Sequence, residues 1–131
     1  MTQAVLPFIR RGGRIVNLSS ISARGGYSTQ SVYAASKAAV KGLTRVWATE
    51  PGHKYGLTVN AVNPGPVDTD MNQAAGPVHL ARMKEENKKV PAGQHCCSVE
   101  DIGDIVAFLA EERSRWVTGG VICANGGILY T

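Results

Sequence analysis

The chain has 131 residues and a formal net charge of +4, with 44% hydrophobic and 18% charged residues. This length and composition predict one folded domain and exclude a disordered or low-complexity chain. The positive residues are scattered along the sequence, and no apolar run is long enough to span a bilayer. We therefore expect neither a nucleic-acid partner nor a membrane partner.

The cysteines and histidines indicate the cellular compartment and whether the chain has a metal site. Cys96, Cys97 and Cys123 form an odd set without the spacing of a disulfide framework, which indicates a reducing, cytoplasmic location. The histidines lack the spacing of metal ligands, and the two adjacent cysteines match no zinc or redox motif. The sequence therefore predicts no metal site.

Helix-like and strand-like patterns alternate along the chain. In chain order, we expect the end of a helix over residues 2–10, a strand over 14–19, a helix over 32–49, a strand over 57–62, a polar helix over 73–88, a helix over 99–110 and a strand over 116–124. This order predicts an α/β fold with a parallel sheet and right-handed crossover helices. In such sheets, ligands bind beyond the carboxyl ends of the strands.

Local signals predict several boundaries and one buried face. Pro51-Gly52 should end the long helix over 32–49. Ser98 should cap the later helix, with Asp101 in its first turn. The buried face of the long helix is expected to consist of Val32, Ala35, Ala39, Leu43, Val46 and Trp47.

Tyr33 and Lys37 are four residues apart in the predicted long helix, so their side chains leave the same face one turn apart. An ammonium beside a phenol favours the phenolate and lowers the pKa of the phenol, which makes the pair an acid–base device. The same spacing also arises by chance in many helices, with the tyrosine packed and the lysine solvated. Neighbouring motifs must decide between these two interpretations.

Further motifs accompany this pair. Asn17-Leu18-Ser19-Ser20 ends a predicted strand, Tyr33 follows Ser20 by thirteen positions, and Asn63-Pro64-Gly65-Pro66-Val67-Asp68-Thr69 follows the next strand. With Val117-Thr118-Gly119-Gly120 and Asn125-Gly126-Gly127, these motifs resemble the second half of a short-chain dehydrogenase/reductase. The resemblance covers nearly every residue from 2 to 127.

The resemblance implies the C-terminal part of a Rossmann-like doubly wound parallel sheet, with three strands and crossover helices. It also implies an NAD(P)-dependent oxidoreductase that interconverts a small carbonyl compound and a secondary alcohol by hydride transfer. Ser20 would bind the substrate oxygen, Tyr33 would be the general acid and base, and Lys37 would lower its pKa and hold the nicotinamide ribose. The residues implied to contact NADP or NAD are Tyr33, Lys37, Pro64, Gly65, Val67 and Thr69. Ser19 and Ser22 would be ordinary capping or turn residues.

The chain departs from the family's pattern in its first half. It has no glycine-rich Thr-Gly-x-x-x-Gly-x-Gly turn to hold the cofactor's pyrophosphate, and no Asn-Asn-Ala-Gly strand end. The residues that choose between NAD and NADP are missing with them. We therefore expect residues 1–131 to be a truncated, partial domain. Its open strand edge would favour a homo-oligomer or association with a full-length relative.

Two alternative functions stay open at this point. A truncated homologue without catalysis would act by associating with another subunit. A nicotinamide-independent isomerase or dehydratase would use Ser20, Tyr33 and Lys37 as acid–base groups alone. The intact set of three argues against an old loss of catalysis. Residues 71–91, which are expected to cover the substrate, give no signature of its shape.

Overall fold

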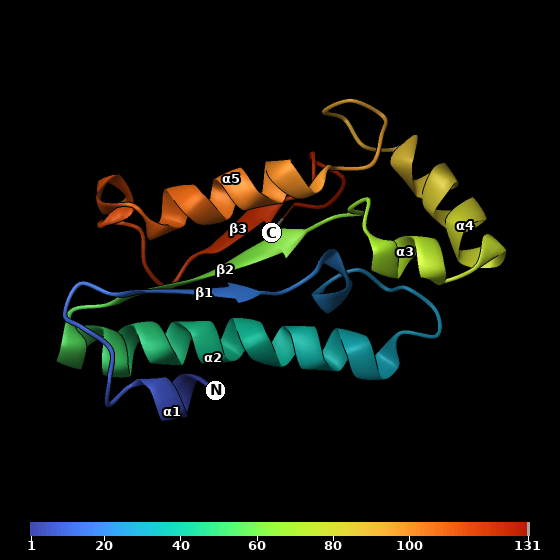
Figure 1. Ribbon diagram of the computed structural model, residues 1–131. Helices are drawn as coiled ribbons and strands as arrows, with labels where there is room; N and C mark the ends of the chain where they lie inside the picture. Colours follow the sequence, from blue (N-terminus) through green and yellow to red (C-terminus); the bar gives the residue numbers. More distant parts are fainter. Residues whose placement is uncertain (131) are drawn as a thin grey trace.

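A computed structural model describes residues 1–130 and consists of a parallel sheet between two layers of helices (Figure 1). In chain order its elements are α1 (Thr2–Val5), β1 (Arg14–Leu18), the 3-10 turn η1 (Ile21–Ala23), α2 (Ser31–Tyr55), β2 (Thr58–Pro64), α3 (Asp70–Ala74), α4 (Pro77–Asn87), α5 (Val99–Ala110), the 3-10 turn η2 (Glu112–Ser114) and β3 (Val121–Ala124). The predicted α/β fold with three parallel strands is confirmed. No helix in residues 1–130 combines the length and the apolar character needed to cross a bilayer.

The strands pair in the order β1-β2-β3, and both pairings are parallel. Arg14 lies opposite Thr58 at the start of the first pair, and Ala61 lies opposite Val121 at the start of the second. β2 is buried over nearly its whole length because it has a neighbour on each side. β1 and β3 form the two edges of the sheet within the described residues.

α5 and α2 cover opposite faces of the sheet (Figure 1). On the α5 side, the centre of the core consists of Val62, Leu109 and Ala124. The apolar stripe of α5 packs against it with Ile102, Ile105 and Val106. Burying a side chain of this size contributes about 1.5–3 kcal/mol, so this contact holds α5 on the sheet. The predicted bounds of this helix, 99–110, are those observed.

The two crossovers of the sheet differ in hand. The steps from β1 to β2 and from β2 to β3 go in the same direction across the sheet, yet α2 covers one face and α5 the other (Figure 1). Parallel crossovers that step the same way over opposite faces have opposite hands. The expectation of right-handed crossovers is therefore wrong for one of the two.

α2 extends beyond the predicted end of the long helix. Pro51 lies inside the helix, and both Pro51 and Gly52 are buried. Proline removes one N–H donor from a helix, but packing of the turn that follows can offset this loss. The helix ends instead at Gly56, where φ is 64° and the N–H donates to the carbonyl of Gly52. A left-handed glycine is a common helix stop because it carries no Cβ.

The predicted buried face of α2 is wrong. Val32, Leu43 and Val46 are 85%, 43% and 49% exposed, and Ala35 and Ala39 are exposed as well. Of the expected set, only Trp47 is even half-buried.

Thr44, in the middle of α2, is fully buried instead. Its hydroxyl donates to the Val40 carbonyl at 2.8 Å and accepts from Asn17 Nδ2 of β1 at 3.0 Å. The helix thus meets the sheet partly through hydrogen-bonded polar groups. The spacing of apolar residues does not predict such a contact, because the residues that make it are polar.

The expected polar helix over 73–88 is two helices, α3 and α4. Gly76 separates them with a φ of 87°, and Pro77 occupies the first turn of α4. Proline is favoured there because the N–H it lacks has no partner within the helix. α3 follows the carboxyl end of β2, and α4 lies beyond α3 (Figure 1).

The two outer segments are shorter than predicted. α1 ends at Val5, where Pro7 follows closely and has no N–H to continue the helix. β3 begins at Val121 rather than at Trp116, which is 95% exposed. Before β3, the Asn60 side chain donates to the Val117 carbonyl at 2.8 Å and accepts from the Gly120 N–H at 3.1 Å.

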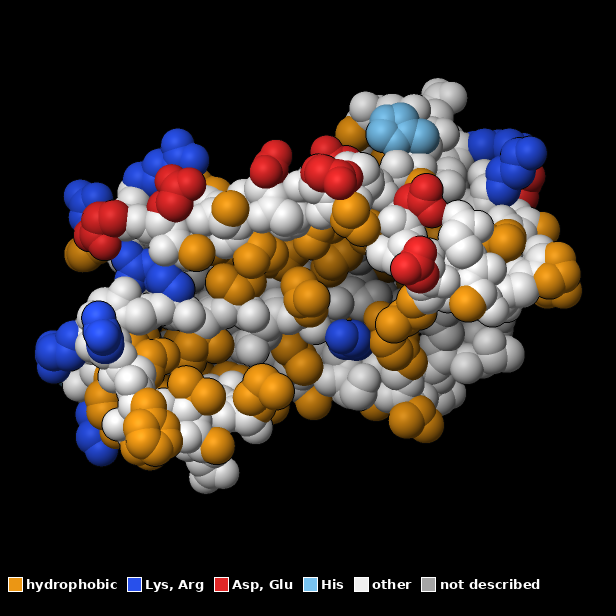
Figure 2. Space-filling view, viewed as in Figure 1, with side chains coloured by type: hydrophobic (Ala, Val, Ile, Leu, Met, Phe, Trp, Pro, Cys, Tyr) orange, Lys and Arg blue, Asp and Glu red, His pale blue; other side chains and the backbone are white. Residues whose placement is uncertain are grey.

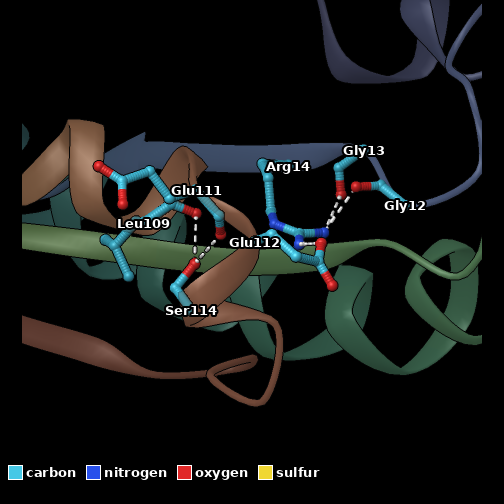
Figure 3. A network of polar contacts seen from close by, with 7 residues as sticks. All are labelled: Gly12, Gly13, Arg14, Leu109, Glu111, Glu112 and Ser114. Atoms are coloured by element: carbon cyan, nitrogen blue, oxygen red, sulfur yellow. Dashed lines mark hydrogen bonds and ion pairs between the residues drawn. The ribbon is translucent and has the colours of Figure 1, made fainter.

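A polar network joins the amino end of β1 to the segment after α5 (Figure 3). Arg14 Nη2 donates to Glu112 Oε2 at 3.0 Å, and Nη1 donates to the Gly12 carbonyl at 2.6 Å. The Ser114 hydroxyl lies 3.0 Å from the carbonyl oxygen of Leu109 and 2.8 Å from that of Glu111. These contacts lie at the amino end of β1, away from the strand ends that carry the predicted site.

Candidate active site

A cavity of about 580 Å³ opens at the carboxyl ends of β1 and β2. Seven residues singled out by their sequence motifs line it together: Ser20, Tyr33, Lys37, Pro64, Gly65, Val67 and Thr69. They come from the loop after β1, the first turns of α2 and the loop after β2. The fold therefore brings every predicted site residue to one place, as the parallel sheet requires.

Ser20 lies where β1 turns into η1. Its hydroxyl oxygen accepts from the Ser22 N–H at 3.1 Å, so it caps the short turn. Ser20 is 9% exposed and lines the cavity. Because the oxygen acts as an acceptor towards the backbone, the hydroxyl hydrogen is available to a ligand. Capping and ligand contact are therefore compatible at this residue.

Ser19 differs from the capping or turn role expected of it. Its hydroxyl donates to the Lys37 carbonyl at 2.9 Å, which links the end of β1 to the second turn of α2. Lys37 Nζ donates back to the Leu18 carbonyl at 3.0 Å. The two bonds fix the backbone and the ammonium of Lys37 against the same strand end.

Tyr33 and Lys37 lie one turn apart on α2 as predicted. Lys37 Nζ is 5.6 Å from the centre of the Tyr33 ring. Tyr33 is 48% exposed, so its phenol is accessible from the cavity. Since one N–H of the ammonium bonds to Leu18, two remain for other acceptors. A positive charge beside a phenol at a cavity wall is suited to proton transfer.

The turn after β2 lies close to the segment after β3. The Gly65 N–H donates to the Ala124 carbonyl at 3.2 Å. A Cβ at Gly65 would lie 3.1 Å from Asn125 Cβ and 3.2 Å from Asn125 Cα. Glycine is therefore favoured here by the neighbouring chain segment, independently of any ligand, because a larger residue would force Asn125 to shift.

Val67 and Thr69 form the next part of the cavity wall. Thr69 caps α3, and its hydroxyl oxygen accepts from the Asn72 N–H. The Val67 carbonyl accepts from Asn72 Nδ2. Within residues 1–130, the Val67 N–H has no hydrogen-bond acceptor. A free N–H and a hydroxyl hydrogen two residues apart match the acceptor oxygen of a carboxamide such as that of nicotinamide.

The sequence motifs missed a second group of cavity residues, which includes Tyr27, Gln30, His79, Arg82, Met83 and Glu86. Four of these recur on α4 at positions 79, 82, 83 and 86, which is the period of one helix face. This spacing was visible in the sequence, but which way the face points depends on the break at Gly76. Burial, followed by the nearby Glu86 carboxylate, raises the pKa of Tyr27 above its ordinary value.

A parallel α/β sheet with a serine at one strand end and a Tyr-x-x-x-Lys pair on the following helix defines a class, the nicotinamide-dependent oxidoreductases of the Rossmann type. A family model described as enoyl-(acyl carrier protein) reductase matches residues 1–129. The chain belongs to the short-chain dehydrogenase/reductase family, whose members are NAD(P)-dependent oxidoreductases.

Relatives with curated names support this membership. The chain is 51% identical over 132 residues to the short-chain dehydrogenase/reductase FrzI of Cladobotryum sp, covering 98% of this chain and 51% of that protein. It is 36% identical over 162 residues to the L-xylulose reductase of Aspergillus niger, covering 100% of this chain and 54% of that protein.

Solved structures agree with the fold. A short-chain dehydrogenase/reductase from Brucella melitensis superposes with a TM-score of 0.88 at 30% identity, over 99% of this chain and 51% of that one. A blue fluorescent protein from a metagenomic library, solved in complex with NADPH, gives 0.83 at 40% identity, over 98% and 50%. The chain spans about half the length of the curated relatives and solved structures that it matches.

Proposed function

We propose that this chain supplies the catalytic part of an NAD(P)-dependent oxidoreductase that interconverts a small carbonyl compound and a secondary alcohol. The observation that supports this most strongly is that Ser20, Tyr33 and Lys37 line one cavity, with Lys37 Nζ held 5.6 Å from the Tyr33 ring. The names of the relatives, among them a L-xylulose reductase, are consistent with it.

Each of the three residues has a distinct role in this proposal. The Ser20 hydroxyl donates a hydrogen bond to the substrate oxygen and orients the carbonyl. Tyr33 gives its phenolic proton to that oxygen during reduction and takes a proton from the alcohol during oxidation. Lys37 stabilises the phenolate that forms, because its ammonium is fixed by the Leu18 carbonyl and stays beside the ring.

The residues around this set fit a nicotinamide dinucleotide. When bound, NADH or NADPH supplies the hydride that reaches the carbonyl carbon, and the oxidised form accepts it in the reverse direction. Tyr33 and Lys37 would hold the ribose hydroxyls, and Pro64 and Gly65 would line the nicotinamide. Val67 and Thr69 would bind its carboxamide through the free N–H and the hydroxyl hydrogen described above.

We further propose that the chain acts as a homo-oligomer. The exposed apolar face of α2, which includes Val32, Leu43 and Val46, supports this assembly.

Substitution of Tyr33 by phenylalanine tests the proposed chemistry. In protein shown by titration to bind NADH or NADPH, Tyr33→Phe should lower carbonyl reduction by roughly 10²–10⁴-fold while cofactor affinity changes little, because the lost proton acts in the transition state. Tyr55→Phe is a matched control, since Lys54 Nζ lies 5.1 Å from the Tyr55 ring at the far end of the same helix, outside the cavity. Unchanged reduction in Tyr33→Phe contradicts the assignment.

A further inference from the structure

One wall of the cavity, formed by α4 and Tyr27, carries polar and charged side chains that have no part in the proposed proton transfer. His79, Arg82, Met83 and Glu86 face the cavity from one side of α4, and Tyr27 lines it from the loop after η1. His79 Nε2 lies 3.2 Å from Asn72 Oδ1, so one of its ring nitrogens already has a partner. The charged groups of this wall are therefore Arg82 and Glu86.

The charges of Arg82 and Glu86 are compensated differently. Glu86 Oε1 accepts from Lys89 Nζ at 2.8 Å, which pairs this carboxylate with a cation on the adjoining turn. Arg82, although half-buried, has no carboxylate within ion-pair distance among residues 1–130. Its guanidinium lies 5.8 Å from the centre of the Tyr27 ring. Within the described residues, the wall thus keeps one positive charge that has no carboxylate at ion-pair distance.

Tyr27 adds a neutral donor beside this charge. Its ring packs against Gly25, where a Cβ would lie only 2.5 Å from Tyr27 Cε2, so the glycine allows the ring its position. Burial first, and then the Glu86 carboxylate, raise the pKa of Tyr27. The phenol therefore stays protonated at neutral pH. No acceptor for its hydroxyl is found in the described part of the chain.

An apolar stretch of the lining accompanies these donors. It consists of Ile21, Pro66, Val67, Met71, Ala75 and Met83. A ligand that fills this cavity would combine an apolar body with a group rich in hydrogen-bond acceptors.

We propose that Arg82, assisted by Tyr27, selects carbonyl substrates that carry a carboxylate at the end remote from the reacting carbon. This inference rests on the proposed function, since it assigns the reacting end of the substrate to Ser20 and Tyr33. A guanidinium binds a carboxylate through two parallel N–H donors, which a neutral ester or hydroxyl cannot match. A charged hydrogen bond of this kind favours the acid over its ester by roughly tenfold to a hundredfold.

The test compares acids with their own methyl esters by binding, without requiring turnover. Dissociation constants of para-acetylbenzoate, the longer para-acetylcinnamate and both methyl esters are measured against the full chain by ligand-observed NMR, in the absence of cofactor. At least one acid should bind roughly tenfold or more tightly than its ester. Arg82→Gln should abolish this difference, and Arg82→Lys should retain part of it. Lys84→Gln, which removes an exposed charge from the same helix, should leave it unchanged.

Three results would overturn the proposal: equal binding of acids and esters by the unsubstituted chain, an acid preference that survives in Arg82→Gln, or an equal loss in Lys84→Gln. A parallel titration with NADPH tests the alternative that Arg82 binds the phosphate oxygens of the cofactor. If Arg82→Gln weakens NADPH binding and spares the acids, the guanidinium serves the cofactor's phosphates and the proposal is wrong. Failure of the Tyr33→Phe experiment would leave this comparison intact, because binding is measured without reduction.

Discussion

At the scale of single residues, side chains that donate to backbone carbonyls hold the end of β1 in place. Lys37 donates to the carbonyl of Leu18, and Ser19 donates to the carbonyl of Lys37. These reciprocal bonds hold the first turns of α2 against the strand end that presents Ser20. The proposed acid–base set is therefore positioned by two hydrogen bonds between the end of β1 and α2, the next helix along the chain.

A second polar contact between the same two elements lies deeper. Thr44 is fully buried and bridges the Val40 carbonyl and Asn17 Nδ2. Thr44→Val keeps the shape of the side chain but leaves Asn17 Nδ2 without its acceptor. The free energy of unfolding should fall by about 0.5–1.5 kcal/mol, the net contribution of a typical hydrogen bond, because Asn17 is half-buried. Urea unfolding followed by circular dichroism measures the change.

Thr49→Val is the matched control for this prediction. The Thr49 hydroxyl also donates to a carbonyl one turn earlier, that of Arg45 at 3.1 Å, but the residue is exposed. Water can replace the lost bond there, so its effect on stability should stay within about 0.5 kcal/mol. If both variants lost the same free energy of unfolding, Thr44 would stabilise the fold only through its bond to the Val40 carbonyl, and its bond to Asn17 would contribute nothing.

At the scale of elements, α5 has a capping box that depends on ionisation. The Ser98 hydroxyl accepts from the Asp101 N–H, and Asp101 Oδ2 accepts from the Ser98 N–H and hydroxyl. The backbone bond from Ser98, and then its hydroxyl, lower the pKa of Asp101 from the ordinary 3.8. A lowered pKa stabilises the fold above the unfolded-state value, and this stabilisation is lost as the pH falls through the folded-state value.

We therefore expect Asp101→Asn to flatten the acid limb of the stability curve. The free energy of unfolding of the unsubstituted chain should decrease more steeply than that of Asp101→Asn as the pH falls below the ordinary carboxyl pKa. Glu100→Gln removes another carboxylate from the same turn without touching the capping box, so its curve should keep the steeper limb. Chemical unfolding at a series of acidic pH values compares the three proteins. Parallel curves for Asp101→Asn and the unsubstituted chain would contradict the linkage.

The helices also show what a sequence can and cannot predict. The bounds of α5 follow from the sequence because its cap and its apolar stripe are local signals. The buried face of α2 does not, since its inward position Thr44 is polar and is satisfied by Asn17, which lies far away in the sequence. The same contrast holds in the site. Tyr33 and Lys37 follow from local spacing, and Ser20 follows from the resemblance of the motifs to a family. Arg82 lines the cavity because of where the fold places α4, which no local signal predicts.

At the scale of the whole molecule, apolar surface gathers on two areas of the view in Figure 2. Hydrophobic side chains lie along the band between the two helix layers, where β1 forms the edge of the sheet, and over the segment around α1 below it. In that segment Val5 is 46% exposed and Phe8 is 84% exposed. Large contiguous apolar areas are uncommon on monomers and mark surfaces that bind other chains.

The outward face of α2 carries further exposed apolar residues, and it is the surface that we expect to join two copies of the chain. On this helix Leu43 is 43% exposed, while Val40 and Trp47 are half-buried. Val46 adds to the same helix at 49% exposure. Self-association would bury the exposed part of these side chains, and for Leu43 and Val46 this is roughly half of the about 1.5–3 kcal/mol that burial of a fully exposed side chain contributes.

The double substitution Leu43→Lys and Val46→Lys should therefore shift the chain towards the monomer, because it places charges where the two copies would meet. Light scattering coupled to size exclusion, over a series of concentrations, should show a dimer or larger oligomer for the unsubstituted chain. The double variant should need at least roughly a tenfold higher concentration to associate. Val78→Lys is the control, since Val78 lies on α4, away from the proposed contact, and is 85% exposed. An unsubstituted chain that elutes as a monomer at every concentration would mean that α2 keeps its apolar face in water.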